Sequence, residues 1–127
     1  MSAPNSAERP IDNRELARLL CSVSPVLSEV HRRHVQSFAT LVPHVYMGDV
    51  LAHVGRLLAQ PPRMQPWQPG GELTDILETL DRGMVQGDRE TRNVVSLSFV
   101  RDGEVEPFFA QLRPLFGPGL RAQVSGR

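Results

Sequence analysis

Residues 87–121 constrain the fold more than any other part of the sequence. The segment reads GDRETRNVVSLSFVRDGEVEPFFAQLRPLFGPGLR and holds four of the five phenylalanines. Three polar residues, Asn93, Ser96 and Ser98, interrupt an otherwise apolar run. An unpaired buried polar group costs about 1–3 kcal/mol, so each needs a hydrogen-bond partner if the run is buried. We therefore expect this segment to be the heart of the domain, with its polar side chains bonded between packed helices.

Two secondary structures fit residues 94–110. The apolar residues of 95–99 alternate with serines, and Asp102-Gly103 is a strong signal for a two-residue hairpin turn. Pro107 would interrupt the second strand, however, and two strands alone make a poor sheet. We predict helix here, with Pro107 at the start of a further helix. An α+β fold with a hairpin at 94–110 is the alternative.

Four segments before this one have the periodicity of amphipathic helices. The first begins at Asp12 or Asn13 and ends at Ser24-Pro25, which also opens the second. The second is expected to bury one stripe, formed by Leu27, Val30, His34, Phe38 and Leu41. The fourth has the clearest spacing, with apolar residues at i, i+3, i+4, i+7 and i+11: Leu73, Ile76, Leu77, Leu80 and Met84. Acidic residues including Glu72 are expected on its solvated face.

The third helix is expected from Pro43 to about Gln60, and it carries two glycines. Gly48 and Gly55 lie seven residues apart on it. Each costs roughly 1 kcal/mol of helix propensity relative to alanine, which suggests that a neighbouring helix approaches closely there.

Together the patterns predict an all-α fold, a single compact bundle of five to six amphipathic helices. We expect residues 1–10 to be a disordered tail, 11–124 to form the domain, and 60–71 to be a Pro-rich surface loop.

Composition narrows the classes of function. The chain has 14 basic and 14 acidic residues and a net charge of zero, which makes nucleic acid an improbable partner. All the basic residues are arginine, so lysine chemistry is excluded. The single cysteine, Cys21, is typical of a reducing compartment, and no apolar run is long enough to span a bilayer. We expect a cytoplasmic protein that does not contact a membrane.

The four histidines are the weak candidates for a metal or acid/base site. His31 and His34 share a face of the second helix, and Asp49 and His53 are spaced to pair on the third, with His44 one turn before Asp49. No third ligand or cysteine cluster accompanies either pair, so we predict no metal, no cofactor and no catalytic residue. A metal-dependent or acid/base enzyme that uses these groups is the alternative function.

Protein binding is the leading prediction, and the Pro-rich loop supplies its candidate residues. Trp67, Met64 and Arg63 are of types enriched at interfaces, and a rigid loop lowers the entropic cost of presenting them. A third possibility is a nucleic-acid-binding regulator, for which Arg32-Arg33 is the only adjacent basic pair. The sequence leaves the oligomeric state open.

Three runs, LVPHVYMGDV, GDRETRNVVSLSFV and PFFAQLRPLFGPGLR, give the chain a resemblance to a group of small bacterial proteins of unassigned function. In that group an L-x-P-H…G-D helix precedes a G-D-x-E…S-F helix and a G-P-x-L-R end. The resemblance covers about two thirds of the chain and implies an all-helical fold. Groups of this size and character often include immunity or antitoxin-like partners of bacterial toxins, and that analogy of type suggests an inhibitor of another protein.

Overall fold

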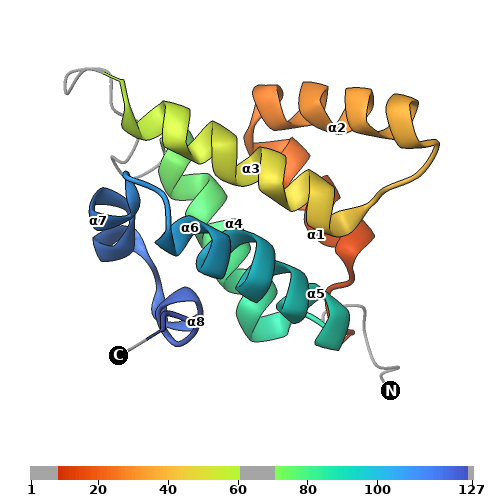
Figure 1. Ribbon diagram of the computed structural model, residues 1–127. Coiled ribbons are helices and arrows are strands. Elements are labelled where there is room, and N and C mark those ends of the chain that lie inside the picture. Colours follow the sequence, from red (N-terminus) through yellow and green to blue (C-terminus); the bar gives the residue numbers. More distant parts are fainter. Residues whose placement is uncertain (1–8, 61–70, 126–127) are drawn as a thin grey trace.

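The computed structural model describes residues 9–60 and 71–125, and the regular elements in these ranges are helices (Figure 1). They are α1 (Asn13–Val23), α2 (Pro25–Phe38), α3 (Pro43–Leu58), α4 (Glu72–Gln86), α5 (Arg89–Val94), the π-helix η3 (Val95–Arg101), α6 (Asp102–Glu104), α7 (Phe109–Leu112), the 3₁₀-helix η4 (Arg113–Leu115) and α8 (Pro118–Arg121). The all-α prediction is confirmed.

The hairpin alternative at 94–110 is wrong, because α5, η3 and α6 follow one another as one helical rod (Figure 1). Asp88 caps its start, since the carboxylate accepts a hydrogen bond from the backbone N–H of Thr91 at 2.8 Å. Val95 and Phe99 are fully buried, whereas Leu97 between them is 44% exposed. Strand alternation would have placed all three on one face, so the burial follows the helical period of about four residues.

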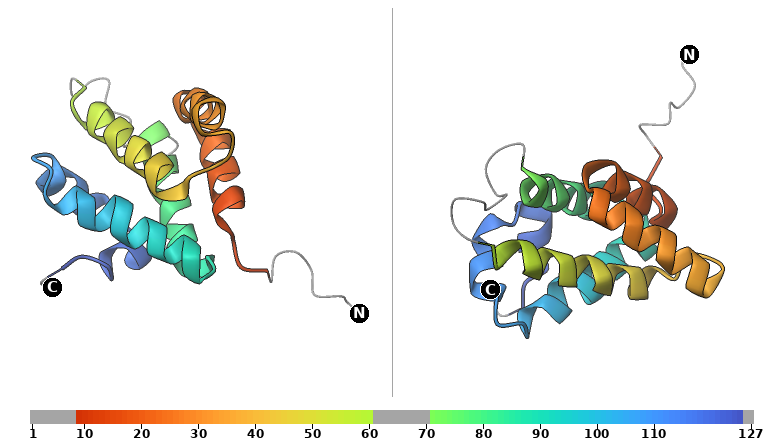
Figure 2. Two further views of the ribbon diagram at one scale, coloured as in Figure 1. Left: turned by 45° about the vertical axis from the view of Figure 1, so that its right-hand side comes forward. Right: turned by 90° about the horizontal axis from the view of Figure 1, so that it is seen from above.

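The rod lies along α3, and α4 packs against α1, α5, η3 and α8. Helix α2 lies on the outside of the bundle, where it packs against α1 and α3 (Figures 1 and 2). Helix α3 is therefore the element between the outer helix and the rod. Its inner face supplies a large share of the core: Tyr46, Met47, Val50, Leu51, His53, Val54, Leu57 and Leu58.

The turn between α1 and α2 is set by local sequence. Asp12 accepts a hydrogen bond from the backbone of Glu15 at 2.8 Å and begins α1, as one of the two predicted caps. Ser24 is extended and accepts from the backbone of Leu27 at 3.1 Å, and Pro25 follows at the first position of α2. The chain thus passes from α1 into α2 through a single non-helical residue, Ser24.

The predicted stripe of α2 is wrong at its C-terminal end. Of this helix only Leu27 and His34 are buried. The helix ends at Phe38 because Ala39 adopts the left-handed conformation, with φ of 66°. Leu41 consequently lies beyond the helix, and Phe38, although still within it, is 49% exposed. Helix α2 is anchored by two buried side chains and leaves an aromatic ring at the surface.

The two glycines of α3 have different surroundings. A Cβ atom at Gly55 would lie 2.6 Å from the ring of Phe108, so this glycine makes room for the phenylalanine. A Cβ atom at Gly48 would meet no atom within 4 Å. The packing reason expected from the sequence is therefore present at Gly55, and the surroundings of Gly48 supply none.

Leu77 and Phe108 should differ in their contribution to stability. Leu77 is 3% exposed, whereas Phe108 is half-buried over Gly55. We expect Leu77→Ala to lower the free energy of unfolding by about 2–5 kcal/mol and Phe108→Ala to lower it by less, because fewer of its contacts are lost. Urea denaturation of both variants measures the order, and an equal or larger loss for Phe108→Ala would contradict this packing.

Candidate functional site

The residues that sequence analysis marked for function do not gather in one place. Arg63, Met64 and Trp67 lie outside the described residues. The histidines lie within them; His34, His44 and His53 each have a hydrogen-bond partner, and the rings of His31 and His34 both contact Tyr46. The two that share a face of α2 already differ in their surroundings.

His34 is buried, and its Nε2 accepts a hydrogen bond from the backbone N–H of Val42 at 2.8 Å. The imidazole therefore fastens α2 to the start of α3. His31 is half-buried and meets the ring of Tyr46 edge-on, with the ring centroids 5.4 Å apart. Neither arrangement brings the two imidazoles to a common ligand.

The histidines of α3 bond to other elements. His44 Nδ1 lies 2.6 Å from the hydroxyl of Ser98 on η3, as expected for a polar residue placed between packed helices. Ser96 likewise donates to Gln123 at 3.0 Å, whereas Asn93 is exposed and does not follow that expectation. His53 Nε2 lies 2.8 Å from Glu72 of α4.

The predicted pair of Asp49 and His53 is thus wrong, because Asp49 is exposed and the carboxylate next to His53 belongs to Glu72. Glu72 also accepts a hydrogen bond from Ser24 at 2.6 Å. Its side chain is only 27% exposed and does not lie on a solvated face. The contact spans 48 residues of sequence, so no local spacing could have pointed to it.

Ser24, His53 and Glu72 are the residue types of a hydrolytic triad, but their hydrogen-bonding pattern is different. Both Ser24 and His53 bond to the same oxygen of Glu72, so the histidine does not stand between the serine and the carboxylate. Ser24 also caps α2 and is fully buried. The hydrogen bonds of this cluster hold the α1–α2 turn, α3 and α4 together.

Within residues 9–60 and 71–125, no group of three or more His, Cys, Asp or Glu side chains is placed to hold one ion. The weak candidates His31, His34, Asp49 and His53 are accordingly not assembled into a ligand set.

Cys21 faces a groove between α1 and α2, and its thiol is not activated. Burial raises the pKa of Cys21, and hydrogen bonds from Tyr46 and Ser28 offset that only in part. The sulfur lies 3.9 Å from the Tyr46 hydroxyl and from the carbonyl of Leu27. A nucleophilic cysteine needs a lowered pKa and a base beside it, so these surroundings favour the neutral thiol.

The groove itself is the most distinctive surface among the described residues. Its volume is about 560 Å³, and its lining contains two arginines, one histidine and no carboxylate: Arg14, Arg18, Cys21, His31, Val35, Ala39, Thr40 and Leu41. Arg14, Arg18 and Cys21 come from α1, His31 and Val35 from α2, and the remaining wall from the segment after Phe38. A protein of zero net charge therefore carries a locally basic groove.

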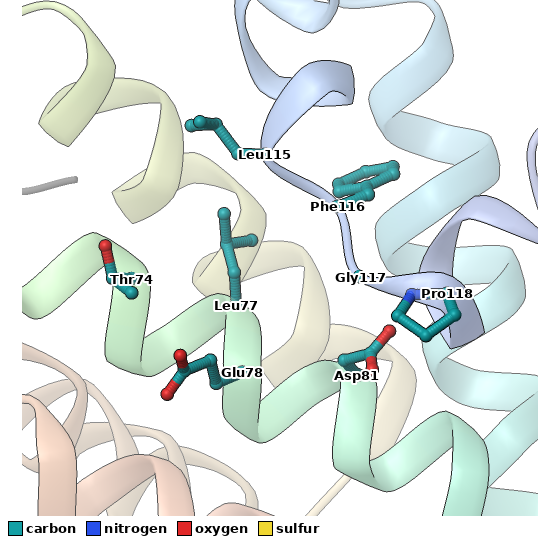
Figure 3. Close-up of a pocket in the computed structure, with 8 residues that line it drawn as sticks. All are labelled: Thr74, Leu77, Glu78, Asp81, Leu115, Phe116, Gly117 and Pro118. Carbon is teal, nitrogen blue, oxygen red and sulfur yellow. The ribbon is translucent and has the colours of Figure 1, made fainter. Parts of the chain in front are cut away.

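A second pocket, of about 410 Å³, lies between α4 and the segment before α8 and has acidic walls (Figure 3). Asp81 points from α4 toward Gly117 and Pro118 and accepts a hydrogen bond from the backbone of Leu120 at 2.9 Å (Figure 3). A Cβ atom at Gly117 would lie 2.7 Å from this carboxyl group, so a glycine is required there. Asp81 thereby fixes the start of α8.

No family model, curated protein or solved structure matches this chain. Across the described residues no helix has both the length and the hydropathy of a membrane-spanning segment. The function is accordingly argued from the arrangement of the side chains.

Replacing Asp81 should loosen α8. We expect Asp81→Ala to lower the free energy of unfolding by about 0.5–2 kcal/mol, the usual effect of losing a side-chain cap, and Asp81→Asn to lower it less because an acceptor remains. Glu78→Ala, at an exposed position on the same helix, is the matched control and should change it by less than about 0.5 kcal/mol. Chemical denaturation measures all three, and equal losses for Asp81→Ala and Glu78→Ala would contradict the capping role.

His34 should make the fold sensitive to acid. Burial lowers its pKa, and the nearby Asp49 carboxylate opposes this while His31 adds to it. Because the folded-state pKa lies below the ordinary value of 6.5, the unfolded chain binds the proton more tightly. The contribution of His34 to stability is therefore complete above that pH and is lost as the pH falls through the folded-state pKa.

The measurement is the melting temperature between pH 8 and 4.5. We expect it to fall below about pH 6.5 in the wild type and to fall less in His34→Gln, whose amide oxygen can replace Nε2 as the acceptor for Val42. His31→Gln, on the same helix, should keep the decline caused by His34. A His34→Gln curve that parallels the wild type would contradict this assignment.

Proposed function

We propose that this chain acts by binding another protein, and that the groove between α1 and α2 receives an acidic segment of that partner. The observation that carries the proposal is the lining of the groove. It combines two arginines and a histidine with apolar residues and contains no carboxylate. Charge of one sign in a concave surface attracts a partner of the opposite sign and speeds the encounter.

The two arginines are available to a partner. Arg14 is exposed, and the side chain of Arg18 is 72% exposed. Arg18 lies 3.4 Å from Glu15, and an exposed pair of this kind contributes about 0–1 kcal/mol, so an incoming carboxylate can replace it. Guanidinium groups bind carboxylates in a bidentate geometry, which gives direction to the contact.

The floor offers apolar area beneath these charges. Cys21, Val35 and Leu41 are each half-buried, so part of their surface remains for a partner side chain to cover. Burial of apolar area supplies most of the affinity of a protein interface, and rim charges mainly set its orientation and rate. A segment with an apolar residue between acidic ones fits this pattern.

Inhibition of the partner, as by an immunity or antitoxin-like protein, is the form of binding that we propose. It rests on the resemblance described above and on the groove. The segment with Arg63, Met64 and Trp67 is the second candidate for partner contact, on the strength of its residue types alone.

The alternative functions have less support. Nucleic-acid binding rests on one adjacent basic pair, Arg32 and Arg33, and both pair with Glu29, as Arg18 pairs with Glu15. His34 and Asp49 line one cavity, but His44 and His53 bond to Ser98 and Glu72, so no single centre joins the groups that an acid/base or metal-dependent mechanism would need.

The test is affinity capture from cells that express the full chain, followed by measurement of binding to the captured partner. We expect Arg14→Glu combined with Arg18→Glu to weaken that binding by at least tenfold, because two favourable contacts become repulsive. Arg89→Glu combined with Arg92→Glu changes the net charge equally at exposed positions of α5 and should leave the affinity within about threefold.

Two further arms sharpen the result. Binding should weaken as salt is raised, because exposed charges are screened. Trp67→Ala measures the contribution of the second candidate segment. For the inhibitor form, growth of cells that express a toxic partner should be rescued by the wild type and the α5 variant but not by the groove variant. Equal binding by all variants would overturn the groove assignment.

A further inference from the structure

The outer face of α3 is a separate surface with an unusual composition. Apart from His44, whose imidazole lies 2.6 Å from Ser98, its exposed positions follow the helical period and contain small residues, one apolar residue and two opposite charges: Val45, Gly48, Asp49, Ala52 and Arg56. Exposed helix faces are usually rich in long polar side chains, which favour the helix and keep it solvated. Around Ala52 this face instead has short side chains.

Gly48 gives the face a feature that the fold does not explain. A glycine within a helix lowers stability by roughly 1 kcal/mol relative to alanine, and the surroundings of Gly48 would accept a Cβ atom. At Gly55 the same cost is offset by the ring of Phe108. If a second molecule packed closely against Gly48, the absence of a side chain would make room for it, as Gly55 makes room for the ring of Phe108.

Two cavities flank the face and meet on it. One, of about 290 Å³, lies between α2 and α3 and includes Phe38, and the other, of about 380 Å³, includes Phe108. Both are lined by Ala52 and Arg56, so they adjoin along α3. Each cavity therefore has one aromatic ring at its wall.

His34 gives the first cavity an unsatisfied polar group. It lines that cavity and is 4% exposed, and its Nε2 is already used as an acceptor, so the proton lies on Nδ1. Nδ1 has no hydrogen-bond partner among the described residues.

Four charged side chains line the two cavities, Arg33 and Asp49 in the first, Glu106 in the second and Arg56 in both, and two of them lie on α3 itself. Asp49 and Arg56 are seven residues apart, which is about 10.5 Å along a helix and too far for them to pair with each other. In the described part of the chain neither forms an ion pair. Their midpoint falls between Ala52 and His53. If a second α3 is laid antiparallel on the first about that point, each Asp49 meets the Arg56 of the other copy.

We propose that two copies of this chain form an antiparallel dimer through the outer faces of their α3 helices, with Asp49 and Arg56 paired across a two-fold axis near Ala52. A two-fold interface must be self-complementary, and this pattern of charge satisfies that requirement. Small residues at the axis allow the two helices to approach closely. Phe38 and Phe108 are partly exposed in one copy. Both rings lie beside the contact, so the dimer buries more of their surface.

The dimer goes beyond the proposed function and does not depend on it. The groove between α1 and α2 shares no lining residue with either cavity beside α3. The double variant Arg14→Glu and Arg18→Glu should therefore leave the dimer intact, so failure of one proposal is distinguishable from failure of the other.

Sedimentation velocity of the full chain over a range of concentrations tests the dimer. We expect the wild type to dimerise, and Asp49→Arg or Arg56→Asp alone to raise the dissociation constant at least tenfold by opposing like charges. The combined swap, Asp49→Arg with Arg56→Asp, restores opposite charges and should return the constant to within about threefold of the wild type. A wild type that stays monomeric would overturn the proposal.

A second set of variants places a bulky side chain at Ala52, the exposed position nearest the two-fold axis. Ala52→Arg should weaken the dimer at least tenfold, and Ala110→Arg, the same change at an exposed alanine of α7, should not. Thermal melts of each variant show that the fold is retained, as expected for exposed positions. A dimer that survives Ala52→Arg, or a double swap that fails to restore it, would refute the antiparallel arrangement.

Discussion

The burial of the inner face of α3 is the interaction on which the remaining structure depends. Eight residues of this sixteen-residue helix are buried, and fully burying one large apolar side chain contributes about 1.5–3 kcal/mol. A typical hydrogen bond contributes about 0.5–1.5 kcal/mol net, so apolar packing decides where α3 lies. Once it is placed, Tyr46, His44 and His53 are carried to Cys21, Ser98 and Glu72, respectively.

The polar contacts then select one arrangement of the packed helices. Glu72 bonds to both Ser24 and His53, and so ties the α1–α2 turn and α3 to the start of α4. Alternative packings that buried similar apolar area would leave these groups unpaired, at a cost of about 1–3 kcal/mol each. His34 acts similarly for α2, which has little apolar area of its own in the core.

The sequence predicted those parts of the fold that depend on local pattern. The spacing of Leu73, Ile76, Leu77, Leu80 and Met84 predicted α4, and all five are buried. Asp12 and Ser24 were predicted as boundaries because a cap acts within three residues of its helix. Prediction was wrong where one residue overrides the pattern, as at Ala39, whose left-handed backbone ends α2 before the stripe is complete.

The candidate sites could not be predicted from the sequence because each is assembled from distant segments. The partner of His53 is Glu72 rather than Asp49, since the spacing of two residues on one helix cannot report a carboxylate that arrives from another. The basic groove combines Arg14 and Arg18 with a segment more than ten residues later, and Cys21 gave no indication of it. A net charge of zero also concealed it, because summation over the chain removes every local imbalance.

The separation of the two proposed surfaces has a consequence for how the protein would work. Helix α2 stands between the groove and the face of α3, so an α3 dimer leaves both grooves open, one on each copy. A partner with a single acidic segment would then bind with unchanged intrinsic affinity at two equivalent sites. A partner that is itself dimeric would gain avidity, because its second segment binds within an already formed complex. The charge on the groove would thus set which partner binds, and the dimer would set how strongly a paired partner is held.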